Sequence, residues 1–254
     1  MRPAEAEAAL RAARTTRHTL APFTDAEPAL DEKWGYDVQA LDRAHRAERG
    51  ERVVGAKLGL TSAAKQQRMN VDQPVVGFLT HAMQQEPAGL AGAIGSWTQP
   101  RIEPEIAFIT GRPIASPVTL AESARVIDAV TVAAEILDSR YDGYRFRLPD
   151  VVADNTSAAG YLLGALLDPS VAEDLARVRC RLAVDGTTVH EATGAAILGD
   201  PLRSIVLLSE HLARRGEVLP AGSLVLAGAL TDAVPLVAGS RYTIEMGELG
   251  SLSV

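Results

Sequence analysis

The chain has 254 residues, of which 47% are hydrophobic and 22% are charged, and its formal net charge at pH 7 is −7. This length and hydrophobic content allow one substantial core, or one core with a small accessory region. The negative charge argues against general binding to nucleic acids or to anionic membrane surfaces, so chemistry on a small molecule fits better.

Nothing in the sequence has the length of a membrane span or the pattern of a secretion signal. No run of about 18 apolar residues occurs, and the first residues form a charged amphipathic stretch. We therefore expect a cytoplasmic protein. Cys180 is the only cysteine of the sequence, and its place in an alternating apolar segment predicts a small core residue and not a nucleophile.

The first part of the chain has helical spacing. Residues 4–14 and 37–49 combine periodic apolar positions with strong helix formers, and Trp34-Gly35-Tyr36 is predicted to separate the two helices. Strand patterns dominate from Arg52 onward, beginning with a strand over 53–60. We predict a mostly helical N-terminal region, residues 1–72, followed by a catalytic domain, residues 73–254.

Two glutamates one residue apart, Glu103 and Glu105, lie in the strand-like segment 100–109. Successive side chains of a strand alternate faces, so both carboxylates point the same way with Cα atoms roughly 6.5 to 7 Å apart, while Ile106 and Phe108 face the opposite side. Like charges this close favour a bound cation. The alternative is that both glutamates occupy the solvent face of an edge strand.

A third carboxylate, Glu135, lies within the apolar run 130–137. A lone carboxylate in such a run is rarely fully buried unless it is paired or coordinated, although a partly exposed strand position is the alternative. Three carboxylates would suit a hard ion such as Mg²⁺ or Mn²⁺. The sequence therefore suggests a metal site.

The second half of the chain alternates helix and strand signals. Thr119 to Glu122 form a capping box that predicts a helix ending near Val130. Asp185-Gly186 predicts a hairpin turn between strands 178–184 and 187–191. Asp200-Pro201 predicts the start of a helix that runs to about Arg215, and strands follow over 223–227 and 241–246.

Five motifs occur in an order that is typical of one enzyme family. They are Lys57-Leu58-Gly59-Leu60-Thr61-Ser62, Pro74-Val75-Val76-Gly77-Phe78-Leu79, Glu103-Pro104-Glu105, Glu135-Ile136-Leu137-Asp138-Ser139-Arg140 and Val152-Ala153-Asp154-Asn155-Thr156-Ser157. Together they resemble the hydratases and decarboxylases of meta-cleavage aromatic degradation, within the fumarylacetoacetate hydrolase superfamily. The resemblance spans nearly the whole chain and implies an α+β, β-rich fumarylacetoacetate hydrolase-like fold behind the helical N-terminal region.

The family comprises 2-keto-4-pentenoate hydratases and 4-oxalocrotonate decarboxylases. Arg101 and the segment 138–150 are more similar to the decarboxylases. The resemblance therefore implies metal-dependent conversion of 4-oxalocrotonate (2-oxo-3-hexenedioate) to 2-hydroxypenta-2,4-dienoate and CO₂, with the hydratase reaction as the alternative. Hydrolysis of a C–C bond ranks lower, because no histidine stands out beside an acidic partner.

The resemblance also implies roles for individual residues. Glu103, Glu105 and Glu135 would bind Mg²⁺ (or Mn²⁺), which acts as a Lewis acid on a 2-oxo acid. Lys57 would be an active-site cation. It could stabilise enolate charge electrostatically, or form an imine if it were neutral, and we favour the electrostatic role because the metal already accepts electrons.

The remaining assignments concern the substrate. Asp154 is predicted to be catalytic, as a proton carrier or as an orienting residue. Substrate binding is predicted for Leu60, Asn155, Ser157, Arg140 and Arg145. Arg140, Arg145 and Arg147 are candidates for the distal carboxylate, with a structural or solvated role as the alternative. An Asx turn is the alternative for Asp154 and Asn155.

The expected partner is a small-molecule 2-oxo-enedioate substrate. We also expect a homo-oligomer and a possible complex with a sister hydratase subunit, whereas nucleic acid and membrane are not expected. A different class of function, a noncatalytic subunit that stabilises a companion enzyme, is argued against by the intact set of glutamates and Lys57.

Overall fold

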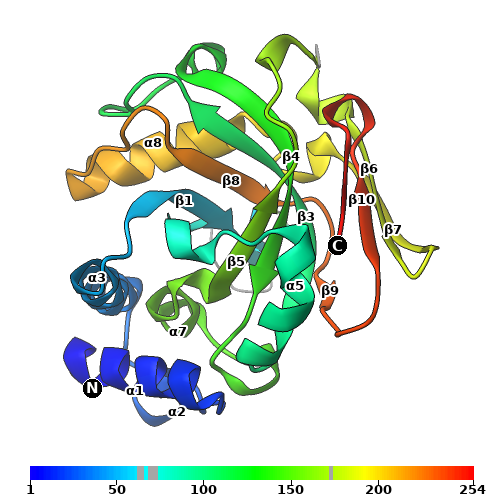
Figure 1. The fold of residues 1–254 in the computed structure, drawn as a ribbon. Coiled ribbons are helices and arrows are strands. Elements are labelled where there is room, and N and C mark those ends of the chain that lie inside the picture. Colours follow the sequence, from blue (N-terminus) through cyan, green and yellow to red (C-terminus); the bar gives the residue numbers. More distant parts are fainter. Residues whose placement is uncertain (62–65, 68–73, 172–173) are drawn as a thin grey trace.

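The computed structural model describes residues 1–61, 66–67, 74–171 and 174–254. Helices gather near the N-terminus and strands dominate the rest, as the sequence predicts (Figure 1). The helices are α1 (Pro3–Thr16), α2 (Phe23–Ala26), α3 (Glu32–Glu48), α5 (Pro87–Ala93), α6 (Leu120–Ser123), α7 (Leu148–Ala153) and α8 (Arg203–Arg215). The strands are β1 (Val53–Gly59), β2 (Val75–Thr80), β3 (Arg101–Thr110), β4 (Ile127–Leu137), β5 (Ala158–Leu163), β6 (Arg179–Val184), β7 (Thr187–Thr193), β8 (Leu224–Ala229), β9 (Val234–Pro235), β10 (Tyr242–Glu245) and β11 (Ser251–Ser253).

The predicted break at residues 34–36 is wrong, because these residues lie inside α3. Asp31 caps this helix by accepting a hydrogen bond from the backbone N–H of Trp34 at 2.8 Å, which starts the helix earlier than expected. The close packing of α7 explains why this helix contains a glycine, Gly35: a Cβ there would lie 2.7 Å from the Pro149 carbonyl oxygen. Tertiary packing overrides the weak helix propensity of glycine here.

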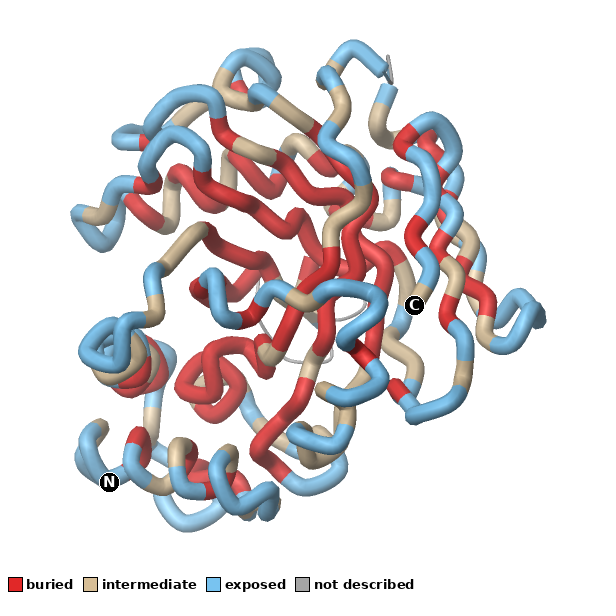
Figure 2. The backbone as a smooth tube through the Cα atoms, viewed as in Figure 1, coloured by how far each residue is buried: buried red, intermediate tan, exposed pale blue. Residues whose placement is uncertain are grey.

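A seven-stranded sheet, counted over the described residues, forms the body of the protein. Its strand order is β2-β1-β8-β3-β4-β5, and β9 pairs with the beginning of β3. Only the β1–β8 pair is parallel among the described pairs of this sheet. Strand β3 therefore lies in the interior, between β8 and β4, where alternating side chains on both faces are covered. Figure 2 shows that the buried residues are concentrated in these central strands.

The second sheet is smaller and has the order β11-β10-β6-β7. The predicted hairpin joins β6 to β7, and Asp185 (φ 50°) and Gly186 (φ 81°) both adopt the left-handed conformation of a tight hairpin turn. Helix α8 ends at Gly216 (φ 65°), as predicted, although it begins at Arg203, after a turn at Asp200 and Pro201. In Figure 1 this small sheet lies to the right of the large sheet and the N-terminal helices lie to its lower left.

The main hydrophobic core lies between one face of the large sheet, helix α8 and the small sheet. Ile106 and Phe108 of β3 are fully buried in it together with Leu208 of α8 and Leu182 of β6, which confirms that the apolar positions of β3 face away from its glutamates. Full burial of such a side chain contributes about 1.5 to 3 kcal/mol. Cys180 is also buried in this core, as predicted, and burial raises the pKa of its thiol to about 12.

The predicted helix from Thr119 to about Val130 is only partly correct. The capping box is present, with Glu122 accepting hydrogen bonds from the Thr119 N–H at 2.8 Å and hydroxyl at 2.7 Å. Helix α6 nevertheless ends at Ser123, and β4 begins at Ile127. Pairing along the whole of β3 extends the strand backward into residues that local sequence assigns to a helix.

The predicted boundary at residues 72 and 73 lies outside the described residues, so it stays a prediction. Strand β1, which precedes it, pairs with β2 and β8 of the large sheet. Within the described chain, no helix is both long enough and apolar enough to cross a membrane.

Candidate metal centre and active site

Three glutamate side chains meet on the face of the large sheet opposite the main core. Glu103 and Glu135 are directly paired across β3 and β4, and Glu105 follows two residues along β3. Directly opposed residues of an antiparallel pair point to the same face, so the register brings together the two segments that the sequence could not connect. Each glutamate offers a carboxylate oxygen such that all three oxygens lie within 4.8 Å of one another.

These carboxylates are buried. Glu105 and Glu135 are inaccessible to solvent and Glu103 is 6% exposed, which excludes the edge-strand and partly exposed alternatives. Oε1 of Glu105 and Oε1 of Glu135 have no hydrogen-bond partner among the described residues. Buried carboxylate oxygens without donors are costly unless a cation lies against them, so the donor set fits a divalent ion.

A β-bulge orients one of these carboxylates. The β3–β8 register shifts between Glu105 and Ala107, and Gly228 of β8 (φ 113°) donates its N–H to Oε2 of Glu105 at 2.8 Å. A Cβ at Gly228 would come within 2.1 Å of the Thr61 hydroxyl oxygen, so only glycine fits. The bulge leaves Oε1 of Glu105 as the oxygen available to a metal.

The pKa values of the cluster reflect this crowding. Burial, followed by the charges of Glu135 and Glu103, raises the pKa of Glu105 well above its usual range. Burial also raises the pKa of Glu135 to about 7, despite the opposing effect of Lys57. Both pKa values are raised because negative charges are held together away from water, and a bound divalent cation would oppose both shifts by stabilising the ionised carboxylates.

Lys57 of β1 is the cation of this site. Its Nζ lies 3.1 Å from Oε2 of Glu135 and donates to the Thr156 carbonyl oxygen at 3.3 Å, and the side chain is 3% exposed. Burial alone would lower the pKa of this ammonium, but Glu135, Glu103 and Glu105 outweigh that effect and raise it. Lys57 is therefore charged, which favours its electrostatic role over an imine.

Asn155, Thr156 and Ser157 form a turn in which all three residues are left-handed, with φ values of 46°, 53° and 62°. Such consecutive non-glycine residues are strained and need support from their surroundings. Asn155 is held by its side chain: Oδ1 accepts from the Phe78 N–H and Nδ2 donates to the Phe78 carbonyl oxygen, both at 2.9 Å. Ser157 is 3% exposed, and its Oγ has no partner within the described part of the chain.

Arg140 and Asp154 are brought together as a buried pair. The Arg140 Nε binds Oδ1 of Asp154, its backbone N–H donates to Oδ2 at 3.0 Å, and its Nη2 donates to the Asp154 carbonyl oxygen at 2.8 Å. Nη1 binds the Asp138 carbonyl oxygen. Burial alone would lower the pKa of the guanidinium, but Asp154 and Asp138 outweigh it and raise the pKa. The guanidinium of Arg140 thus binds other groups of the protein, namely Asp154 and the Asp138 carbonyl oxygen.

The other two predicted substrate residues lie in different surroundings. Leu60 follows β1 directly, adopts a left-handed conformation (φ 59°) and packs with Tyr36 and Val75. Arg145 is not brought to the carboxylates: its side chain is 63% exposed and pairs with Asp25 at 2.8 Å. Substrate binding by Arg145 thus stays a prediction that its position does not support.

Sequence reasoning missed Thr156 and Gly228, which contact the site through backbone atoms only. Thr156 lies in one of the five family motifs, but a carbonyl or N–H contact leaves no side-chain signal in a sequence. A separate cleft of about 410 Å³ lies between α3, α8 and the start of β1, where Gln39, Arg43 and His211 line it. Glu103, Glu105, Glu135 and Lys57 do not line this cleft, so it is separate from the carboxylate cluster.

Comparisons with known proteins agree with this arrangement. The family model described as "Fumarylacetoacetate (FAA) hydrolase C-terminal" matches residues 52–254. A 4-oxalocrotonate decarboxylase of a Pseudomonas species is 41% identical over 232 residues, which are 91% of this chain and 90% of that protein. A 2-keto-4-pentenoate hydratase of Burkholderia vietnamiensis is 38% identical over 251 residues, 96% of this chain and 94% of that protein.

The structural comparison agrees over nearly the whole chain. The structure of 4-oxalocrotonate decarboxylase from Pseudomonas putida G7, complexed with magnesium and adipate, superposes with a TM-score of 0.92 at 32% identity. The match covers 98% of this chain and 95% of that one. The expected α+β, β-rich fold with its helical N-terminal region is confirmed.

Proposed function

The chain belongs to the fumarylacetoacetate hydrolase family, and we propose that it is a divalent-metal-dependent carboxy-lyase, a 4-oxalocrotonate decarboxylase. The observation that carries the proposal is the buried set of Glu103, Glu105, Glu135 and Lys57. When all four are ionised their net charge is −2, which one divalent cation neutralises. Relatives that bear this activity match more than nine-tenths of the chain.

The metal is Mg²⁺ (or Mn²⁺), held by Glu103, Glu105 and Glu135. An all-carboxylate set suits a hard cation, and the partnerless Oε1 atoms of Glu105 and Glu135 support the assignment. The structure of the Pseudomonas putida G7 relative was determined with magnesium. When bound, the ion supplies a Lewis acid for the 2-oxo acid end of the substrate.

Lys57 supplies fixed positive charge beside the carboxylates. Loss of CO₂ from the distal carboxylate sends an electron pair through the conjugated double bond toward the 2-oxo oxygen, where negative charge develops. A buried ammonium near that oxygen stabilises the developing charge, and it acts strongly because water is excluded. The contacts with Glu135 and the Thr156 carbonyl keep Lys57 in place for this role.

Among the predicted substrate residues, Ser157 has the strongest support. Its buried hydroxyl has no partner among the described residues, so a substrate oxygen could satisfy it. Leu60 lies just beyond the strand that carries Lys57 and could form an apolar wall. For Asp154, Asn155 and Arg140, bonds to other protein groups support an orienting role more than direct substrate contact.

The proposal extends to assembly and location. The substrate is a small 2-oxo-enedioate; we add a homo-oligomer, association with a sister hydratase and a cytoplasmic location as parts that remain to be tested. Light scattering of the purified protein, alone and mixed with the hydratase, measures both kinds of assembly.

The test uses chelator-stripped protein with fresh 4-oxalocrotonate, with and without Mg²⁺, and records CO₂ release. Metal-dependent CO₂ release that Glu105→Gln abolishes supports the proposal. Absence of CO₂ from metal-loaded, folded protein refutes it.

Hydration of 2-hydroxypenta-2,4-dienoate is the alternative, because a hydratase relative matches 96% of the chain at 38% identity. One substrate has a 2-oxo acid head and the other has the enol form of such a head, so the same metal site would serve either reaction. The two differ at the distal end, where only the decarboxylase must accept a second carboxylate. A parallel incubation of the protein with the dienoate, in which loss of the dienoate is monitored by ultraviolet absorbance, distinguishes the two activities.

A further inference from the structure

The left-handed turn at residues 155–157 lies against the free edge of β2. Strand β2 pairs with β1 on one side, and side chains take the place of a strand on the other. The Phe78 N–H and carbonyl oxygen both bond to the Asn155 side chain. The Val76 N–H donates to the Tyr36 hydroxyl at 3.1 Å, and the Val76 carbonyl oxygen accepts from Gln39 at 3.0 Å.

We propose that Asn155 and the Arg140–Asp154 pair are positioning residues, which hold this turn so that the Thr156 carbonyl fixes Lys57 beside Glu135. The side chain of Asn155 imitates a strand partner, so it fixes the turn in both register and distance. Held in this way, the turn presents the Thr156 carbonyl oxygen to Nζ of Lys57. The activity readout of this inference rests on the proposed function.

The space between turn and strand leaves no slack. A Cβ at Gly77 would lie 2.5 Å from the Thr156 hydroxyl oxygen and 3.0 Å from Oδ1 of Asn155. Gly59, which follows Lys57 by two residues on β1, would place a Cβ 3.7 Å from Nζ and 3.9 Å from Cβ of Thr156. Gly77 therefore lets the turn approach β2 closely, whereas a Cβ at Gly59 would make only ordinary contacts with Lys57 and Thr156.

Arg140 holds the residue that directly precedes the turn. It binds the side chain and carbonyl of Asp154, which precedes the turn, and the carbonyl of Asp138, which follows the strand carrying Glu135. The Asp138 N–H donates to the Ser157 carbonyl oxygen at 2.9 Å. One guanidinium thus ties the loop after β4 to the turn, and so links the metal-binding strand to the carbonyl that contacts Lys57.

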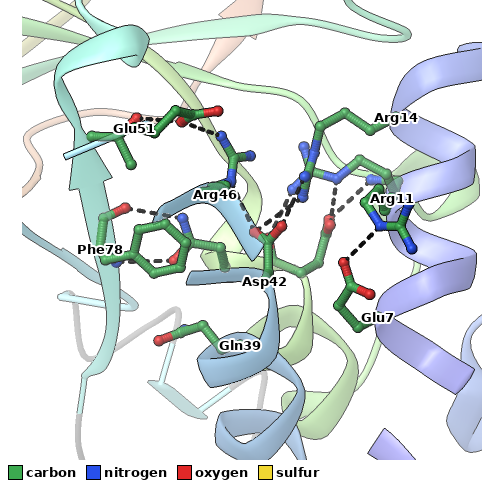
Figure 3. Close-up of polar contacts among 12 residues, drawn as sticks. Glu7, Arg11, Arg14, Gln39, Asp42, Arg46, Glu51 and Phe78 are labelled. Carbon is green, nitrogen blue, oxygen red and sulfur yellow. Dashed lines mark hydrogen bonds and ion pairs between the residues drawn. The ribbon is translucent and has the colours of Figure 1, made fainter. Parts of the chain in front are cut away.

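The N-terminal helices support the same structure from outside. Gln39 of α3 donates to the Val152 carbonyl oxygen at 3.1 Å as well as to Val76, and so connects the helix before the turn to β2. Figure 3 shows the polar contacts behind it, in which Asp42 of α3 binds Arg14 of α1 and Arg46, and Arg46 reaches Glu51. These helices precede the residues that match the family model, and through Gln39 they support the active-site turn.

Two variants test the inference. Asn155→Asp keeps the size and tolerates a left-handed conformation, but it loses the donor to the Phe78 carbonyl; Gln84→Glu makes the same chemical change at an exposed residue. Arg140→Lys keeps the charge but loses the forked contacts, and Arg181→Lys is its control, in an exposed pair with Glu245 on the small sheet.

Four measurements follow on each folded variant: thermal unfolding, Mn²⁺ binding by calorimetry, kcat and KM for CO₂ release, and mass-spectrometric mapping of Lys57 acetylation by acetic anhydride. We expect kcat to fall at least 30-fold in Asn155→Asp and Arg140→Lys, with KM and the Mn²⁺ Kd within threefold of the unaltered protein. Acetylation of Lys57 should rise at least fivefold in Arg140→Lys, whose net charge is unchanged. Both controls should match the unaltered protein.

Other outcomes overturn the inference. Unchanged kcat and acetylation in folded variants would mean that the turn does not position Lys57. An increase confined to KM would make Asn155 or Arg140 a substrate contact, and a parallel loss of Mn²⁺ affinity would assign them to the metal site. If the unaltered protein releases no CO₂, the proposed function fails, whereas acetylation still decides the positioning role. Should Asn155→Asp not fold, Arg140→Lys decides alone.

Discussion

Replacing Glu105 by glutamine should have different effects on the stability of the metal-bound and the metal-free protein. Glutamine has the same shape as glutamic acid, and its carbonyl oxygen can accept the Gly228 N–H that now bonds to Oε2. The change removes one of three buried carboxylates whose oxygens lie within 4.8 Å of one another. Two unit charges at that distance repel by about 3.5 kcal/mol at an effective dielectric constant of about 20.

Without metal, the Glu105→Gln protein should therefore be as stable as the unaltered protein, or more stable. Because the pKa of Glu105 is raised, part of the repulsion is already relieved by protonation, so the gain is smaller than the full repulsion. With Mg²⁺ present, the unaltered protein should instead be the more stable of the two. At a Mg²⁺ concentration of about 100 times Kd, the unaltered protein gains about 2.7 kcal/mol. For a chain of this size that raises Tm by roughly 5–11 °C.

Scanning calorimetry with and without Mg²⁺ measures both effects, with isothermal titration for the Kd. Glu105→Gln should lose most of the metal-dependent rise in Tm and keep or exceed the metal-free Tm. Glu86→Gln, at an exposed position, should behave like the unaltered protein. A full metal-dependent rise in Glu105→Gln would refute the assignment of Glu105 as a ligand.

Lys57→Met should lower kcat at least 100-fold while Mn²⁺ affinity, measured by calorimetry, stays equal or increases, because a cation beside the metal site is removed; a weaker Mn²⁺ Kd would argue against this electrostatic role. Gly77→Ala should destabilise the protein by about 1 to 3 kcal/mol in urea unfolding, because its Cβ would lie 2.5 Å from the Thr156 hydroxyl oxygen. Gly89 lies in helix α5, and a Cβ there would have no described atom within 4 Å, so Gly89→Ala should be neutral or stabilising by about 0.5–1 kcal/mol. Equal losses of stability at Gly77 and Gly89 would contradict the close-approach argument. Burial, followed by Arg215 and Arg214, lowers the pKa of His211 to about 4, so the folded protein binds fewer protons there than the unfolded chain between about pH 6.5 and 4. Stability should fall as pH falls through that window, and urea unfolding at pH 7 and 5 should show a smaller loss in His211→Gln; an equal loss would mean that other groups cause it.

The sequence was informative where function depends on side chains at short spacing. Alternation along one strand correctly places Glu103 and Glu105 on one face, opposite Ile106 and Phe108. Their contact with Glu135 depends on strand register, which is a long-range property that spacing does not reveal. Resemblance to the family supplied this connection.

Local signals failed where tertiary contacts decide the structure. The predicted break at residues 34–36 was wrong because packing on α7 requires a glycine inside a helix. The helix predicted after Thr119 is short because β3 imposes strand pairing from Ile127 onward. The left-handed turn at residues 155–157 could not be foreseen, since its support comes from the backbone of Phe78, far away in the sequence.

The central claim is that the buried carboxylates and Lys57 form a metal site for decarboxylation. The most direct test compares kcat/KM for CO₂ release from 4-oxalocrotonate with kcat/KM for hydration of 2-hydroxypenta-2,4-dienoate, in one preparation of Mg²⁺-loaded protein. We predict that decarboxylation exceeds hydration at least 100-fold and that both rates vanish on removal of the metal. Faster hydration, or CO₂ release that persists without metal, would contradict the account.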